Sequence, residues 1–151
     1  MKQITQRVAE LRVSYQPTKS KKTVIQTSLD AYNVLREFFP TDTIALQERF
    51  VTMYLNRSNT VLGIYVASNG GISGTVADPR LILATALKVV ATSIILAHNH
   101  PSGNMKPSKA DEQLTRKIKE ASLFMDIQLT DHIILSPTKG EYYSLADEGL
   151  M

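Results

Sequence analysis

The feature of this sequence that most restricts its fold is residues 93–97, which read Ser-Ile-Ile-Leu-Ala and end directly before His98. The run does not alternate between polar and apolar positions, and it contains β-branched side chains. A strand of this kind is typically buried on both faces, as the central strand of a sheet that helices cover on both sides. We therefore expect this strand to lie inside a sheet, with other elements packed on both of its faces.

The rest of the pattern predicts the elements around this strand. Ser28 is the expected N-cap of a first helix that Pro40 stops, and Asp78-Pro79 is a good start for a second helix. Helices are expected over about 29–38, from 79 to about 90, and from 108 to about 124. Two strands, over 45–55 and 60–68, are expected to form a β-hairpin with its turn at 56–59. Further strands are expected near 72–76 and over 126–135, and a short strand or turn is expected from 141. Residues 3–13 alternate loosely between apolar and polar and can pair at a sheet edge. This order predicts a mixed sheet flanked by helices, in the α/β class bordering on α+β.

Length and composition limit the chemistry that is available. The 151 residues suit one domain, which we expect to span 28–151 behind an N-terminal arm of residues 1–27. The chain has no cysteine, so thiolate catalysis and cysteine-based zinc fingers are excluded, and nitrogen and oxygen atoms must hold any metal. Residues 1–22 lack an apolar run of signal-peptide length, and no later run is long enough to span a membrane. The cytosol is the expected compartment, with no membrane partner.

The N-terminal arm carries most of the basic excess. Residues 1–22 contain one acidic side chain, Glu10, against the basic Lys2, Arg7, Arg12, Lys19, Lys21 and Lys22. Such a basic segment can bind nucleic acid weakly. More often, a run of charged residues is simply a solvated tail.

The pair His98 and His100 marks the end of the apolar strand. Side chains separated by one residue on a strand point to the same side, so both imidazoles can reach one ion. Pro101 ends the strand, and Gly103 allows the loop to turn back towards a helix whose first turn contains Asp111. Two imidazoles and one carboxylate leave a fourth position for water, which is typical of catalytic rather than structural zinc.

Each of these residues has an alternative interpretation. A single histidine at a strand end is usually a hydrogen-bonded surface or core residue. Ser108 and Asp111 also fit a capping box, with Ser108 as N-cap and an acid three residues later. The two readings of Asp111 are expected to compete in part, because a carboxylate committed to zinc is not free to cap the helix, although Ser108 can cap it in either case.

Two further residues need an assignment. On the expected strand 45–55, Glu48 shares a face with Leu46 and Phe50, and a carboxylate on a face that points into the core is costly unless it is paired. That conflict points to a function, although an edge strand with a solvated Glu48 explains it equally well. His132 lies in the middle of a strand, on the face opposite Asp131, and is interpreted as a structural histidine.

The motif His98-Asn99-His100-Pro101-Ser102-Gly103 is followed, six residues after Pro101, by Ser108 and then by Asp111, with Glu48 upstream. With this spacing, residues 28–150 resemble the RadC family, within the JAMM (JAB/MPN) metalloprotease-like superfamily. The resemblance implies a cytidine-deaminase-like JAB/MPN fold with a curved mixed sheet between helices. RadC proteins commonly carry an N-terminal helix-hairpin-helix region, and residues 1–27 show no such hairpin, so the chain resembles a short form. Its sequence between Gly70 and Arg80 also departs from that of longer members.

The resemblance also implies an activity. It implies a zinc-dependent metallopeptidase or isopeptidase in which His98, His100 and Asp111 bind Zn²⁺, Glu48 is the catalytic base and Ser108 stabilises the oxyanion. The partner is then a protein or peptide substrate that the sequence does not identify. Two alternatives remain open: an accessory protein of DNA repair whose metal site is structural or vestigial, and a metal-free interaction module.

Overall fold

The computed structural model describes residues 9, 12, 14–70 and 76–151. Within them, five strands form one sheet and three helices pack against it. The helices are α1 (Ser28–Phe38), α2 (Pro79–Lys88) and α3 (Lys109–Leu123), and the strands are β1 (Arg49–Leu55), β2 (Val61–Asn69), β3 (Ser93–Asn99), β4 (Gln128–Leu135) and β5 (Tyr142–Ser144).

The sheet is mixed, and β3 is its central strand. The strand order is β2-β1-β3-β4-β5, with β1 antiparallel to β2 and β3, β3 parallel to β4, and β4 antiparallel to β5. All seven residues of β3 are buried, as its apolar sequence predicts. The strand also continues two residues beyond the expected end at Ala97, so that His98 and Asn99 lie within it.

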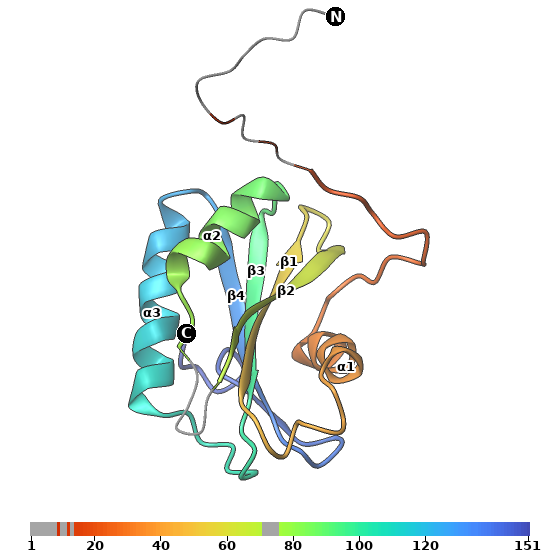
Figure 1. Ribbon diagram of the computed structural model, residues 1–151. Coiled ribbons are helices and arrows are strands. Elements are labelled where there is room, and N and C mark those ends of the chain that lie inside the picture. The colour runs from red at the N-terminus through yellow and green to blue at the C-terminus, as the bar shows by residue number, and fades with distance from the viewer. Residues whose placement is uncertain (1–8, 10–11, 13, 71–75) are drawn as a thin grey trace, which may run out of the picture.

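Helices cover both faces of the sheet. Helix α1 lies on one face, and α2 and α3 lie together on the other (Figure 1). Each layer has its own apolar core: Leu35 of α1 packs with Met53 and Ile133 on one face, and Ile82 and Ile118 pack with Leu96 on the other. The predicted mixed sheet between helices is therefore confirmed.

The helix starts follow local hydrogen bonding. The expected cap of α1 at Ser28 is wrong by one residue: Thr27 caps the helix, because Asp30 stands three residues after it and completes a capping box. Asp78 caps α2 as predicted, and its side chain accepts a hydrogen bond from the backbone N–H of Arg80. Helix α2 ends at Lys88, before the expected end at Val90, where the backbone has a φ of 56° and leaves the helical region.

The predicted β-hairpin is present, but its first strand starts late. β1 and β2 pair antiparallel around a turn in which the Asn56 side chain accepts hydrogen bonds from the backbone N–H groups of Ser58 and Thr60. β1 begins at Arg49 rather than at residue 45, and Leu46 is 80% exposed. The expectation that Leu46 and Glu48 share a core-facing side of this strand is therefore wrong.

Two expected strands cannot be compared with the structure in full. The strand near 72–76 and the alternating segment 3–13 lie almost entirely outside the described residues. Across residues 14–70 and 76–151, no helix has both the length and the apolarity that crossing a membrane requires.

Candidate metal centre

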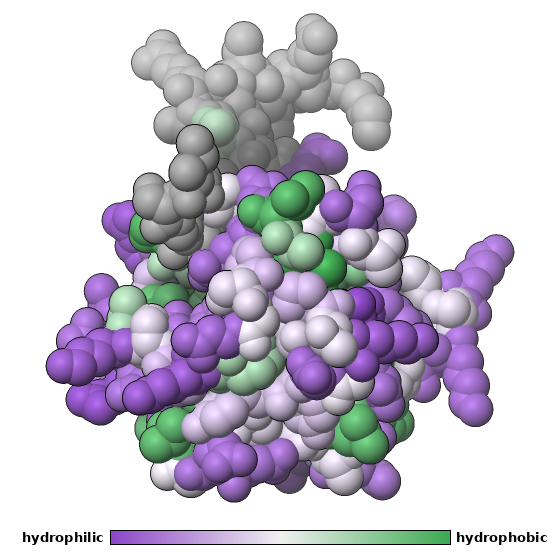
Figure 2. Space-filling view, turned by 90° about the horizontal axis from the view of Figure 1, so that it is seen from below, coloured by the Kyte–Doolittle hydropathy of each residue, from purple (hydrophilic) through white to green (hydrophobic). Residues whose placement is uncertain are grey.

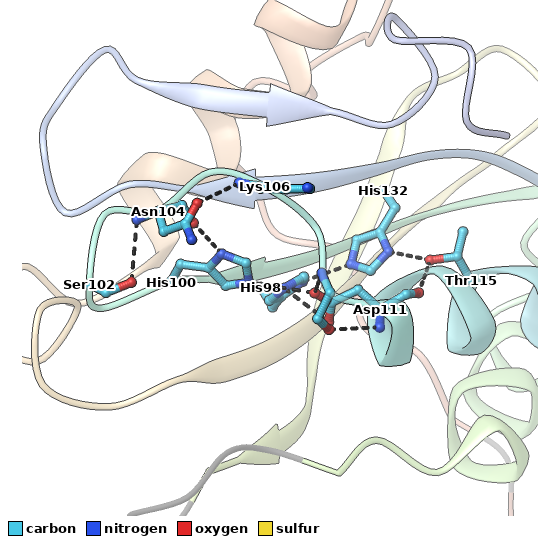
Figure 3. Close-up of polar contacts among 9 residues, drawn as sticks. His98, His100, Ser102, Asn104, Lys106, Asp111, Thr115 and His132 are labelled. Carbon is cyan, nitrogen blue, oxygen red and sulfur yellow. Dashed lines mark hydrogen bonds and ion pairs between the residues drawn. The ribbon is translucent and has the colours of Figure 1, made fainter.

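Three side chains that could hold a metal ion meet where β3 ends and α3 begins. His98 is on β3 and fully buried, His100 follows the strand, and Asp111 is in the first turn of α3. Their ligand atoms all lie within 4.8 Å of one another. The Nε2 atoms of the two histidines are 2.9 Å apart. Asp111 Oδ1 lies 3.4 Å from His98 Nε2, and Asp111 Oδ2 lies 3.6 Å from His100 Nε2 (Figure 3).

The start of α3 fixes the Asp111 carboxylate. Ser108 is the N-cap, and its Oγ accepts a hydrogen bond from the Asp111 backbone N–H at 3.1 Å. In return, the Ser108 backbone N–H donates to Asp111 Oδ2 at 2.7 Å. The Asp111 carboxylate thus completes the capping box and at the same time faces both histidines, so its position fits both readings.

His100 is oriented by the loop that follows it. Its Nδ1 donates a hydrogen bond to the Asn104 carbonyl oxygen, which has no proton of its own to give. In the neutral imidazole the proton is therefore on Nδ1, and Nε2 presents a lone pair towards His98 and Asp111.

The electrostatics of the group favour a positive charge among these atoms. Burial alone would raise the pKa of Asp111, but the facing imidazoles of His100 and His98 hold that pKa far below its usual range. Burial likewise opposes protonation of His100, yet hydrogen bonds with Asp111 and the Asn104 carbonyl, together with the charges of Asp111 and Glu48, raise the pKa of His100. The negative charge that favours a proton on His100 would also favour a metal cation in its place, with the deprotonated Nε2 atoms as ligands.

His132 contacts the Nδ1 side of His98, whereas His100 and Asp111 face its Nε2. The chain places His132 on β4, fully buried, with its Nε2 2.8 Å from His98 Nδ1 and its Nδ1 2.6 Å from Thr115 Oγ1. Burial, followed by the charge of His98, lowers the pKa of His132 well below the usual value. Sequence reasoning treated His132 as structural and did not connect it, or Thr115, to His98. No spacing in the sequence carries this contact, because it depends on the parallel pairing of β3 with β4.

Asn99, between the two histidines, fixes the backbone around Glu48. Its amide donates to the carbonyl oxygens of Ile44 and Gln47 at 2.8 and 2.9 Å, and its Oδ1 accepts from the Arg49 N–H at 2.7 Å. The side chain is fully buried. These bonds hold the residues on both sides of Glu48 against the end of β3.

Glu48 itself is half-buried and precedes β1 directly. Phe50, two residues after Glu48, is paired with His98 in the antiparallel β1–β3 ladder. Glu48 therefore lies opposite His100, just beyond the end of the paired strands. Its charge contributes to the raised pKa of His100. Of the five expected site residues, the structure thus brings His98, His100, Asp111 and Ser108 into one contact group, with Glu48 within electrostatic range.

The surface around this end of the molecule is mainly polar. The loop after β3 lies at the bottom of Figure 1, and Figure 2 views the molecule from that side. Hydrophilic residues dominate the coloured surface there, and apolar residues form small separate areas.

The chain is similar to a known protein family and to curated proteins of that family. The sequence profile of the RadC-like JAB domain matches residues 25–150. A "UPF0758 protein" from Flavobacterium johnsoniae is 43% identical over 126 residues, which are 83% of this chain and 53% of that protein. A protein with the same description from Porphyromonas gingivalis is 41% identical over 127 residues, which are 84% of this chain and 54% of that protein. Another, from Methanosarcina mazei, is 35% identical over 130 residues, which are 86% of this chain and 55% of that protein. The chain spans about half the length of these curated relatives. On the extent of the profile match and these identities, it belongs to the RadC-like JAB domain family.

Proposed function

We propose that this protein is a zinc-dependent hydrolase that cleaves a peptide or isopeptide bond. The observation that carries the proposal is the convergence of His98 Nε2, His100 Nε2 and the Asp111 carboxylate within 4.8 Å. Their lone pairs and negative charge face one another, which is unfavourable unless a cation lies among them. The superfamily that the sequence resembles includes metalloproteases, and this supports a catalytic role for the cation.

The donor set favours zinc. Two imidazole nitrogens and one carboxylate oxygen suit Zn²⁺, whereas Mg²⁺ and Ca²⁺ prefer oxygen ligands alone. Three protein ligands leave a position open, as in catalytic zinc sites. Bound zinc supplies Lewis acidity, which lowers the pKa of a coordinated water to about 7.

The remaining chemistry falls to the residues of the chain. Glu48, at the level of His100, accepts the proton of the attacking water and later delivers it to the leaving amine. The Ser108 Oγ accepts a hydrogen bond from the Asp111 N–H, and this leaves its hydroxyl proton to donate to the oxyanion that develops on the attacked carbonyl. The substrate is a protein or peptide that contains the amide bond.

Metal content tests this proposal directly. Wild type, Asp111→Ala and the control Glu112→Ala are purified side by side, supplied with zinc, desalted and measured by elemental analysis. Glu112 is the matched control because it is the other acid in the first turn of α3. We expect about one zinc per chain in wild type and Glu112→Ala, as a three-ligand site predicts, and less than about a tenth of that in Asp111→Ala. Negligible zinc in all three proteins, or equal zinc in all three, would refute the assigned site.

The charge of the N-terminal arm supports a second function, which is weak binding of nucleic acid. Lys19, Lys21 and Lys22 are exposed, and residues 1–22 contain only one acidic side chain. We expect the full chain to bind a duplex DNA oligonucleotide in a fluorescence anisotropy titration, with an affinity that falls steeply as salt rises. Deletion of residues 1–22 should abolish this binding. Binding that is insensitive to salt, or that survives the deletion, would contradict the assignment to the arm.

A further inference from the structure

We infer that His132 and Thr115 are positioning residues for the metal site, because together they fix the His98 tautomer that keeps Nε2 free for a metal. The inference rests on the proposed function, since it assigns His98 Nε2 as a metal ligand. The residues form a continuous chain of contacts from the backbone of α3 to His98, as Figure 3 shows.

The first step is the position of the Thr115 hydroxyl proton. Thr115 Oγ1 is 2.6 Å from the Asp111 carbonyl oxygen and 2.6 Å from His132 Nδ1. Two oxygens at that distance repel each other unless a proton lies between them, and only the hydroxyl can supply one. The hydroxyl proton therefore points to Asp111, and Thr115 must accept its second hydrogen bond from His132 Nδ1–H.

The second step is the other nitrogen of His132. The ring is fully buried, and among the described residues its two nitrogens contact only Thr115 and His98, neither of which is an anion. A buried charge without a counter-ion is costly, so the ring is neutral and carries its single proton on Nδ1. His132 Nε2 therefore presents a lone pair to His98 Nδ1 across 2.8 Å.

The third step determines the protonation of His98. Its Nδ1 must carry the proton that His132 Nε2 accepts, so the neutral ring has no proton on Nε2. That nitrogen faces Asp111 Oδ1 and His100 Nε2. The chain of contacts thus starts at the Asp111 carbonyl and returns to the Asp111 carboxylate.

Packing holds the two imidazoles in this relation. Phe50 stacks on His98 with ring centroids 5.8 Å apart and meets the edge of His132 at 5.5 Å. All three rings are nearly or fully buried. The rings cannot easily turn over to exchange the roles of their nitrogens, since such a dense interior leaves little space for it.

Nitrogen NMR of the metal-free wild type tests the tautomers without any metal. The chain has only three histidines, and all three belong to this group, so ¹⁵N-histidine labelling reports on nothing else. At a pH that keeps the rings neutral, we expect pyrrole-type signals from Nδ1 and pyridine-type signals from Nε2 in all three. A pyrrole-type Nε2 in His98 or His132 would overturn the inference, whether or not the protein binds zinc.

Zinc affinity of Thr115 variants tests the consequence for the metal. Thr115→Val removes the acceptor for His132 Nδ1–H, and the zinc affinity measured against a chelator should fall by about 10- to 100-fold, as when other residues that orient a ligand are lost. Thr115→Ser keeps the hydroxyl and should restore both the affinity and the tautomer pattern. The matched control is Thr85→Val, because Thr85 on α2 makes the same bond to the carbonyl four residues before it but touches no histidine.

The outcomes separate this inference from the proposed function. If wild type binds zinc and Thr115→Val binds it as tightly as Thr85→Val does, the positioning role is refuted and the metal site stands. If wild type binds no zinc but shows the expected tautomers, the metal site is refuted and the tautomer relay stands.

Discussion

Amide hydrolysis by the zinc-loaded protein is expected to fall by about 10²- to 10⁴-fold when Glu48 is replaced by glutamine, while bound zinc stays at the wild-type level. Glutamine keeps the shape and polarity of the side chain but cannot accept a proton from water. Glu48 is not part of the His98, His100 and Asp111 group, so metal retention should not depend on it. The combination of lost turnover and retained zinc distinguishes a base from a ligand.

The measurement uses a mixed peptide library, with new cleavage products counted by mass spectrometry and zinc measured on the same samples. Glu112→Gln is the control, because it removes an acid from the first turn of α3 without changing the segment before β1. Cleavage by Glu48→Gln at the wild-type rate would remove Glu48 from the mechanism. Loss of zinc in that variant would instead make Glu48 a ligand.

Replacing Asn99 with alanine is expected to destabilise the metal-free protein by about 3 kcal/mol. The change leaves the carbonyl oxygens of Ile44 and Gln47 and the N–H of Arg49 without their partner. An unsatisfied buried group costs about 1–3 kcal/mol. Ile44 is buried, whereas Gln47 is exposed, so its carbonyl can form a hydrogen bond to water instead. The total destabilisation therefore stays near the lower end of the range obtained by adding the costs of the three groups. Hydrolysis should fall as well, because the backbone on both sides of Glu48 is released.

Urea unfolding checks this expectation, with Asn99→Asp and Asn104→Ala as companions. Asn99→Asp keeps the acceptor for Arg49 but sets a carboxylate against two carbonyl oxygens, so it should destabilise at least as much as alanine does. Asn104 is exposed, and its side chain accepts a hydrogen bond from the Lys106 N–H, so Asn104→Ala should cost less than about 1 kcal/mol. A loss below about 1 kcal/mol for Asn99→Ala would show that these bonds do not hold the segment.

Local sequence features predicted the strand and the helix start that carry the candidate site. The apolar run before His98 marked β3, the alternation of strand side chains directed His98 and His100 to one side, and Ser108 and Asp111 marked the start of α3. All of these signals lie within residues 93–111, where spacing along the chain translates directly into direction. The extent of each element was less accurate, because the ends of strands depend on their neighbours in the sheet.

Contacts between distant segments were not predictable in the same way. Glu48 was expected on the core face of a strand with Leu46, but Asn99 holds this segment in an irregular conformation and Leu46 points to solvent. The alternation correctly put Asp131 and His132 on opposite faces: Asp131 accepts from the Ser144 hydroxyl, and His132 contacts His98. Which residue His132 would meet depends on the register between β3 and β4, and nothing in the spacing of residues along the chain specifies that register.

The capping box at the start of α3 also determines when the Asp111 side chain loses its conformational entropy. Ordering a side chain of this size costs on the order of 1 kcal/mol. Because the Ser108 N–H already holds the carboxylate, this cost falls on the formation of the helix and not on the capture of an ion. A longer, freely rotating carboxylate at the same position would lose that entropy on binding. In the proposed metal site, the serine before α3 would thus strengthen metal binding through preorganisation, without contributing a ligand.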